Sequence, residues 1–155
     1  IADASGAYPG TEAITTAISA LWGTQNALPK WPETAGSPPS AWSLPGLYIQ
    51  ATKHAPQVTF AKIDTAYDET QQDFVRLAGF PDEDLMKMID DNTAFSEAGG
   101  ATIHAWVGPG TLHTILGRPD LYKVEVGGTK LIDWITDLVD GDDVPDVHCT
   151  DCGRP

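Results

Sequence analysis

Asp68 and His113 are the two residues of this chain whose types and positions could do chemistry together. A carboxylate that accepts the Nδ1–H of an imidazole fixes the ring tautomer and stabilises the positive charge that the ring acquires. The other ring nitrogen is then free to take a proton from a hydroxyl nucleophile. The pair therefore indicates general base chemistry of the kind that activates a serine for acyl transfer.

Both residues follow apolar, β-rich runs, residues 58–63 before Asp68 and residues 101–107 before His113. We expect each run to be a strand and each residue to stand in the loop at its carboxyl end. Other roles remain open. Asp68 can be a helix cap, and His113 can be a structural histidine.

Three other titratable residues lie in or near the same predicted elements. Asp64 is a rival acid, because it lies nearer the end of the first strand. His104 falls within the second strand, where a packed or surface histidine is expected. His54 ends a helical pattern, where a cation is favoured without any function.

The elements around these residues predict an α/β fold with a largely parallel sheet. The patterns predict strands over 58–63 and 101–107 and helices over 11–22, 47–54, 69–77, 82–89 and 131–138. They also predict a tight reversal over 124–131 and a polar loop over 140–155. Two or three strands give these helices too little surface to cover. We therefore expect further strands from a separate N-terminal chain, so that residues 1–155 form one part of a single domain.

Residues 24–45 form a proline-rich excursion with Trp31 and Trp42 between the prolines. So many prolines exclude regular structure there. We predict a lid-like segment or pocket wall in which Trp31, Trp42 and the nearby Tyr67 contact substrate. A plain surface loop anchored by the two tryptophans is the alternative, and core packing is the alternative for at least one of them.

The bulk composition excludes several partners. A formal net charge of −13 argues against nucleic acid, and no apolar run is long enough to span a membrane. No His/Asp cluster has ligand spacing, so we expect no metal and no cofactor. The chain opens at Ile1 without a signal peptide, which suggests a processed chain or a fragment.

Cys149 and Cys152 lie close together in the polar tail. A local disulfide in an oxidising compartment is the favoured interpretation. An inert thiol pair, a redox pair and a zinc site are the alternatives, although with His148 a zinc site would still have only three ligands.

Three short segments resemble the pectin acetylesterase/Notum family of α/β-hydrolases. AYDETQ resembles the strand-end motif around that family's acid, GTLHTIL resembles its histidine loop, and IADASGAY resembles a strand end that follows its nucleophile helix. The resemblance implies that Asp68 is the acid and His113 the base. It also implies the C-terminal half of an α/β-hydrolase fold and favours Asp68 over Asp64.

The chain departs from that family at the nucleophile. No Gly-x-Ser-x-Gly elbow occurs in the 155 residues, and the tail lacks the family's dense cysteines. Ser5 lacks the glycine two positions earlier that an elbow needs, so a turn residue is expected. Ile1 cannot act as an N-terminal nucleophile.

These observations predict a secreted serine ester hydrolase, of carboxylesterase or deacetylase type, whose serine lies on another chain of the same precursor. Two alternatives stay open. One is a depolymerase of polyesters such as polyhydroxyalkanoates, and the other is a non-catalytic chain that binds glycans through exposed aromatic rings. A metal-dependent hydrolase has little support.

Overall fold

The main sheet of the protein has four parallel strands. The structure, a computed structural model, describes residues 1–8, 12–80 and 84–153. The strands lie side by side in the order β1 (Ala2–Asp3), β2 (Thr59–Thr65), β3 (Thr102–Gly108) and β6 (Val147–His148). The predicted α/β class with a largely parallel sheet is confirmed at this level. Its assignment to half of a hydrolase fold stays a prediction.

The central pair, β2 and β3, carries most of the sheet. These strands pair over seven residues each, from Thr59 opposite Thr102 to Thr65 opposite Gly108. The two outer strands are much shorter, since β1 pairs with β2 only at Ala2 and Asp3. Because all four strands are parallel, their carboxyl ends meet at one edge of the sheet.

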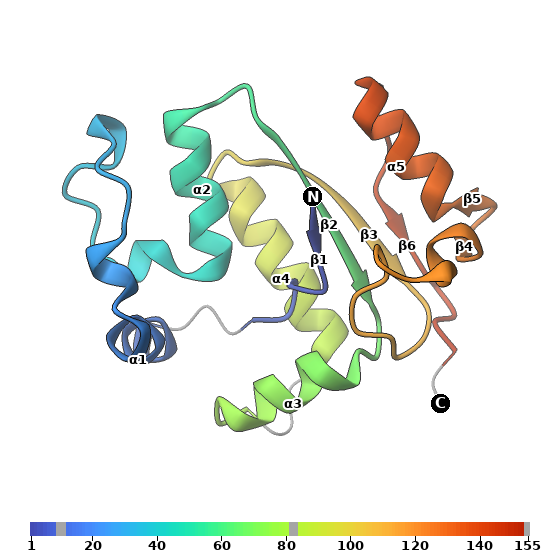
Figure 1. The fold of residues 1–155 in the computed structure, drawn as a ribbon, viewed down its shortest axis with the longest axis horizontal. Helices are drawn as coiled ribbons and strands as arrows, with labels where there is room; N and C mark the ends of the chain where they lie inside the picture. Colours follow the sequence, from blue (N-terminus) through green and yellow to red (C-terminus); the bar gives the residue numbers. More distant parts are fainter. Residues whose placement is uncertain (9–11, 81–83, 154–155) are drawn as a thin grey trace.

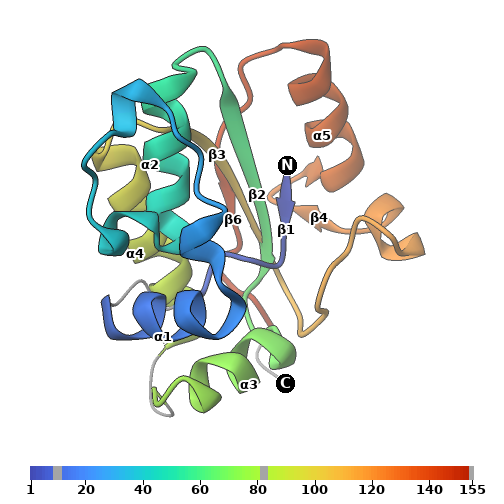
Figure 2. The same cartoon turned by 60° about the vertical axis from the view of Figure 1, so that its left-hand side comes forward.

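Helices cover both faces of this sheet. The helices are α1 (Glu12–Trp22), α2 (Leu44–His54), α3 (Glu69–Leu77), α4 (Leu85–Ala98) and α5 (Leu131–Asp140). In Figure 1, α2 and α4 lie on one side of the strands and α5 lies on the other, while α3 lies beside the carboxyl end of β2. Figure 2 shows the same separation from a second direction.

Alternation along β2 sends neighbouring side chains into two different cores. Ala61 and Ile63 join Trp106 of β3 and Trp134 of α5, whose rings meet edge to face with centroids 5.7 Å apart. The opposite core lies against α3 and α4 and contains Ala66, Ala7, Val75, Leu85, Ile89 and Val107. Lys62 and Asp64, whose side chains alternate with Ala61 and Ile63, are also buried.

The predicted terminal helix and the reversal before it are both present. Leu131, Trp134, Ile135 and Leu138 belong to the core under α5, as their helical spacing predicts. The reversal is a hairpin of β4 (Glu125–Val126) and β5 (Thr129–Lys130). Gly127 and Gly128 turn it with φ of 59° and 88°, which suits a tight hairpin.

Several predicted boundaries were wrong for local reasons. Helix α2 begins at Leu44, before the predicted residue 47, because Ser43 Oγ caps it by accepting Gly46 N–H at 3.2 Å. Pro45 fits that first turn, where no backbone N–H is needed. Helix α4 begins at Leu85, capped by Asp84, and continues to Ala98, well past the predicted end at 89. Of its predicted start, residues 82–83 lie outside the described residues.

Two segments expected to be irregular contain short elements. Val147 and His148 pair with Trp106 and Val107, so the prediction of a loop throughout 140–155 was wrong. Residues 24–45 contain three short 3₁₀ turns, Thr24–Asn26, Pro32–Thr34 and Pro39–Trp42, before α2 begins. The prolines at positions 32 and 39 start such turns, because their fixed φ is compatible with a helical first residue.

Candidate active site

Asp68 lies in the loop after β2, at the carboxyl edge of the sheet. The loops after β2 and β3 run together, with Ala66 N–H donating to Gly108 O at 2.9 Å and Tyr67 N–H donating to Gly110 O at 3.0 Å. Asp68 is also the N-cap of α3, since its Oδ1 accepts Gln71 N–H at 3.0 Å. The helix-cap interpretation of Asp68 is therefore correct, and it leaves the second carboxylate oxygen for another partner.

That partner is His113. Its Nδ1 lies 2.9 Å from Asp68 Oδ2, while Asp68 is fully buried and the His113 side chain is 35% exposed. A carboxylate can only accept, so Nδ1 is the protonated ring nitrogen and Nε2 carries the lone pair. Within the described residues, Nε2 has no hydrogen-bond partner. The imidazole therefore has the tautomer and the open nitrogen that a general base needs.

The histidine loop is anchored from both sides. Thr65 Oγ1 donates to Leu112 O at 2.6 Å, which ties the residue before His113 to the end of β2. The Asp3 carboxylate accepts the N–H groups of Ile115 and Leu116 at 2.9 Å. Thr114 has the left-handed φ of 55°, a strained conformation for a β-branched residue. Reasoning from the sequence missed this role of Asp3, because nothing in its local pattern reveals a partner so distant in the chain.

Asp64, the rival acid, does not reach His113. Its side chain is 2% exposed, and its Oδ1 accepts Gly6 N–H at 2.9 Å and Gln71 Nε2–H at 3.0 Å. Burial raises the pKa of Asp64, an effect that these donors and the nearby Lys62 oppose. Burial in turn lowers the pKa of Lys62, whose Nζ donates to Thr93 Oγ1 at 2.8 Å. The structure thus brings Asp68, and not Asp64, to the imidazole.

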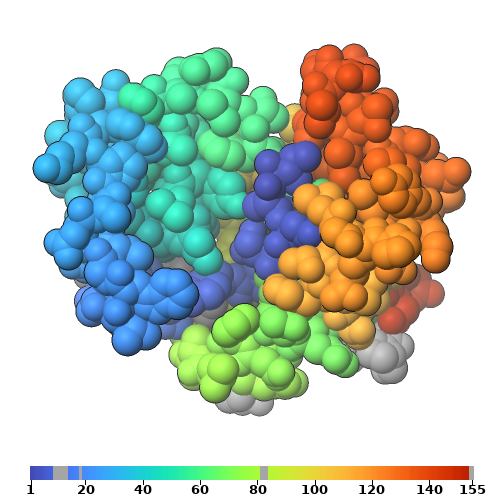
Figure 3. All heavy atoms as spheres, in the orientation of Figure 1, coloured from blue at the N-terminus to red at the C-terminus, as the bar shows by residue number. Residues whose placement is uncertain are grey.

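A small hollow opens beside His113. Its volume is about 160 Å³. Besides His113 it is lined by Ala4, Ser5, Ala7, Tyr8, Leu44, Gln71, Phe74 and Val75. This lining is largely apolar and comes from the segment after β1, the first turn of α2, and α3. Figure 3 shows the N-terminal segment, in dark blue, exposed between the regions around α2 and the loop after β3.

The aromatic residues predicted to contact substrate lie elsewhere. Trp31 and Trp42 line a separate hollow of about 310 Å³ beside α2. Trp31 stacks on His54, with ring centroids 4.3 Å apart. Tyr67 precedes Asp68 but packs against the core under α3 and α4. In this structure none of the three lines the hollow beside His113.

Ser5 shares that hollow but does not bond to the imidazole. The Ser5 Oγ is buried and has no hydrogen-bond partner among the described residues. Ser5 follows Ala4, which has a left-handed φ of 58°, in keeping with the predicted turn. No serine hydroxyl is bonded to His113 in the part of the chain that the structure describes.

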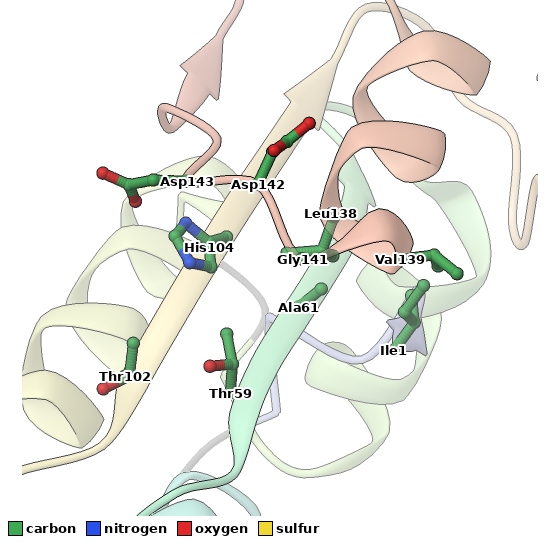
Figure 4. A pocket seen from close by; sticks show the side chains of 10 residues that line it. All are labelled: Ile1, Thr59, Ala61, Thr102, His104, Leu138, Val139, Gly141, Asp142 and Asp143. Carbon is green, nitrogen blue, oxygen red and sulfur yellow. The ribbon is translucent and has the colours of Figure 1, made fainter.

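A larger hollow, about 460 Å³, lies at the other end of the sheet, away from Asp68 and His113. Figure 4 shows it between the starts of β2 and β3 and the end of α5, with the half-buried His104 opposite Asp142 and Asp143. His104 therefore lies far from the candidate site.

The two cysteines form a disulfide. This confirms the favoured interpretation of the pair. His148 lies close to both sulfurs, but the covalent bond occupies them. None of the described helices has the length and apolar character needed to cross a bilayer.

Comparisons with protein-family models, with curated proteins and with solved structures found no match to this chain. The interpretation of the site therefore depends on its geometry and on the short motifs in the sequence.

Proposed function

We propose that this chain supplies the acid and the base of a Ser-His-Asp triad in a secreted ester hydrolase of carboxylesterase or deacetylase type. The observation that carries the proposal is the 2.9 Å contact between His113 Nδ1 and the fully buried Asp68. A capping aspartate needs no histidine, and a surface histidine needs no buried carboxylate. Their combination at the carboxyl edge of a parallel sheet supports a catalytic pair.

The pair would act in two proton transfers. As a serine Oγ attacks the ester carbonyl, His113 Nε2 takes the serine proton and Asp68 stabilises the imidazolium. When the tetrahedral intermediate collapses, the imidazolium gives this proton to the leaving alcohol. Water then repeats the sequence on the acyl-enzyme, which releases the carboxylic acid and restores the serine.

The serine would come from polypeptide outside these 155 residues. The outer edge of β1 pairs with no strand among residues 1–8, 12–80 and 84–153, so a further parallel strand can add there. The motif resemblance implies the same place, since IADASGAY is similar to a strand end that follows the family's nucleophile helix. We therefore propose that the N-terminal part of the same precursor pairs beside β1 and carries the elbow serine.

The test is to isolate the protein from its natural source with a tag on this chain and treat it with a fluorophosphonate probe. The probe is expected to label a serine on the accompanying polypeptide, and His113→Ala is expected to abolish that labelling. His104→Ala, a half-buried histidine at the opposite end of the sheet, is the matched control. Labelling that survives His113→Ala unchanged would exclude the proposed role.

Secretion belongs to the same proposal. The Cys149–Cys152 disulfide supports an oxidising compartment such as the extracellular space. Intact mass and N-terminal sequencing of the natural protein would show whether the serine-bearing part is a separate chain.

A non-catalytic glycan-binding chain is the second candidate. The hollow lined by Trp31, Trp42, Tyr48 and Phe60 favours it, because sugar rings stack on aromatic faces. It predicts glycan binding that depends on Trp31 and Trp42 and is indifferent to Asp68 and His113.

A further inference from the structure

Gln71 lies between two buried carboxylates. Its Nε2 is 3.0 Å from Asp64 Oδ1 and 3.0 Å from Asp68 Oδ2. All three side chains are buried. One neutral amide group therefore donates to both acids at once, and its two N–H bonds are both used.

The orientation of this amide is fixed by the backbone. Ala7 N–H donates to Gln71 Oε1 at 3.0 Å, and a backbone N–H can only donate. The amide oxygen must face Ala7, so the NH₂ group must face the carboxylates. A flipped amide would place its oxygen against two carboxylates and leave the Ala7 N–H without its acceptor, at a cost of about 1–3 kcal/mol for that buried donor alone.

The segment that sets this orientation is itself held firmly. Gly6 N–H donates to Asp64 Oδ1, and Asn92 Nδ2 donates to Gly6 O at 2.7 Å and to Tyr8 O at 2.8 Å. A Cβ at Gly6 would lie 2.3 Å from Asp64 Oδ2, so only glycine permits this close approach. The wall of the hollow beside His113 and the Asp68 carboxylate are thus joined through Gln71 and Asp64.

We propose that Gln71 is a positioning residue, whose amide holds Asp68 Oδ2 on the Nδ1–H of His113, and that Asp64 anchors this amide. This inference rests on the role proposed above for Asp68 and His113. The helix-cap bond to the Gln71 backbone holds only Oδ1 of Asp68. Without the Gln71 side chain, the Asp68 carboxylate can turn while it keeps its helix-cap hydrogen bond, so that Oδ2 leaves His113 Nδ1. The imidazole would then be a mixture of tautomers.

The test is an NMR measurement of the His113 ring nitrogens, with this chain labelled with ¹⁵N-histidine in the protein as purified. The wild type is expected to show a single neutral tautomer with a slowly exchanging proton on Nδ1. Gln71→Met is expected to lose that proton signal and to mix the tautomers. Gln72→Met is the matched control, since it makes the same change one residue along α3, outside the bridge.

Asp64→Asn tests the anchor and is not a control. Because the Asn amide oxygen can still accept from Gly6 and Gln71, the His113 signal is expected to stay, and its loss would contradict an anchor that acts through the acceptor oxygen. If Gln71→Met fails to fold, Gln71→Glu decides the matter, because Glu keeps an acceptor for Ala7 but cannot donate to both acids. A folded Gln71 variant with the wild-type tautomer and Nδ1 proton would overturn the inference.

The measurement needs neither an ester nor a serine, so its failure is distinct from failure of the proposed function. In the labelling experiment, Gln71→Met is expected to slow fluorophosphonate reaction about 10- to 100-fold, as small misplacements of catalytic groups do. A changed tautomer with no labelling in any variant would reject the esterase and keep the role of Gln71. Labelling of Gln71→Met at the wild-type rate, together with an unchanged His113 tautomer, would keep the esterase and reject the role of Gln71.

Discussion

The carboxyl edge of the sheet and the proline–tryptophan segment 24–45 hold their side chains in different ways. At the edge, hydrogen bonds join residues distant in the chain, such as Asp68 with His113 and Ala7 with Gln71. In the segment, most hydrogen bonds close short turns, as when Thr34 N–H donates to Trp31 O. Its rings meet in contacts such as the Trp31–His54 stack, and both members of the His54–Glu33 pair are over 40% exposed.

The side chains at the sheet edge therefore have a fixed geometry, whereas those of segment 24–45 belong to local surface structure. A group held by several buried, long-range bonds keeps one position, which is what catalysis requires. A group held by local turns and exposed ring contacts can shift at small cost. We therefore place the chemistry at the sheet edge and expect the segment to affect binding at most.

The largest effect is expected from Asp68→Asn, which tests the edge directly. The variant removes the charge and allows the wrong imidazole tautomer, so fluorophosphonate labelling of the natural protein should slow by about 10⁴-fold. Stability should change little, because asparagine is as good a helix cap as aspartate.

Asp84→Asn is the matched control for this change. Asp84 caps α4 as Asp68 caps α3, but it is exposed and bonds to the Lys87 backbone. Its labelling rate should equal that of the wild type. Labelling of Asp68→Asn within tenfold of the wild type would reduce Asp68 to a helix cap.

The sequence was a good guide to long elements and a poor guide to short ones. Strands β2 and β3 have β-branched and apolar runs, and α5 has helical spacing, so local patterns predict them. Strand β6 is two residues long, and its existence depends on the pairing of Val147 with Trp106, which no local pattern encodes. The start of α2 differs from the prediction because Pro45 is a first-turn residue of the helix and does not break it.

The candidate site was predictable only in part. The order and loop positions of Asp68 and His113 predict their pairing, and the structure places them together. Trp31 and Trp42 do not line the hollow beside His113, although Leu44 lines both that hollow and the one beside α2. Their predicted contact with substrate stays a prediction. The bridging role of Gln71 depends on Ala7 and Asp64 meeting it in the fold, which the motif alone does not reveal.

The next largest effect is the pH dependence of the stability that Asp64, the second buried acid at the sheet edge, contributes. Burial raises the pKa of Asp64 in the folded protein, so the folded state binds this proton more tightly than the unfolded chain. The stability that Asp64 contributes is complete below its unfolded pKa of about 3.9 and is lost as the pH rises through its folded pKa. The groups that face it are Lys62, whose charge opposes the rise, and Asp68 and Tyr48.

Asp64→Asn should therefore become more stabilising relative to the wild type as the pH rises from 4 toward neutrality. Urea unfolding at several pH values measures this difference. Asp73→Asn, an exposed acid on α3 that pairs with Arg76, is the control and should show no such gain. A difference that is constant with pH would mean that Asp64 is as readily ionised in the fold as in the unfolded chain.

The smallest effect is expected from Trp31→Ala, which tests the other side of the comparison. Trp31 is half-buried, and its ring stack on His54 should contribute about 0.5–1.5 kcal/mol to the free energy of unfolding, measured in urea. Labelling by the probe should stay within threefold of the wild type, because Trp31 is absent from the hollow beside His113. Trp22→Ala, a 77% exposed tryptophan at the end of α1, is the control for the loss of an indole. If Trp31→Ala, and not Trp22→Ala, slowed labelling as strongly as Gln71→Met, the segment would contact the substrate, and the division between the two regions would be wrong.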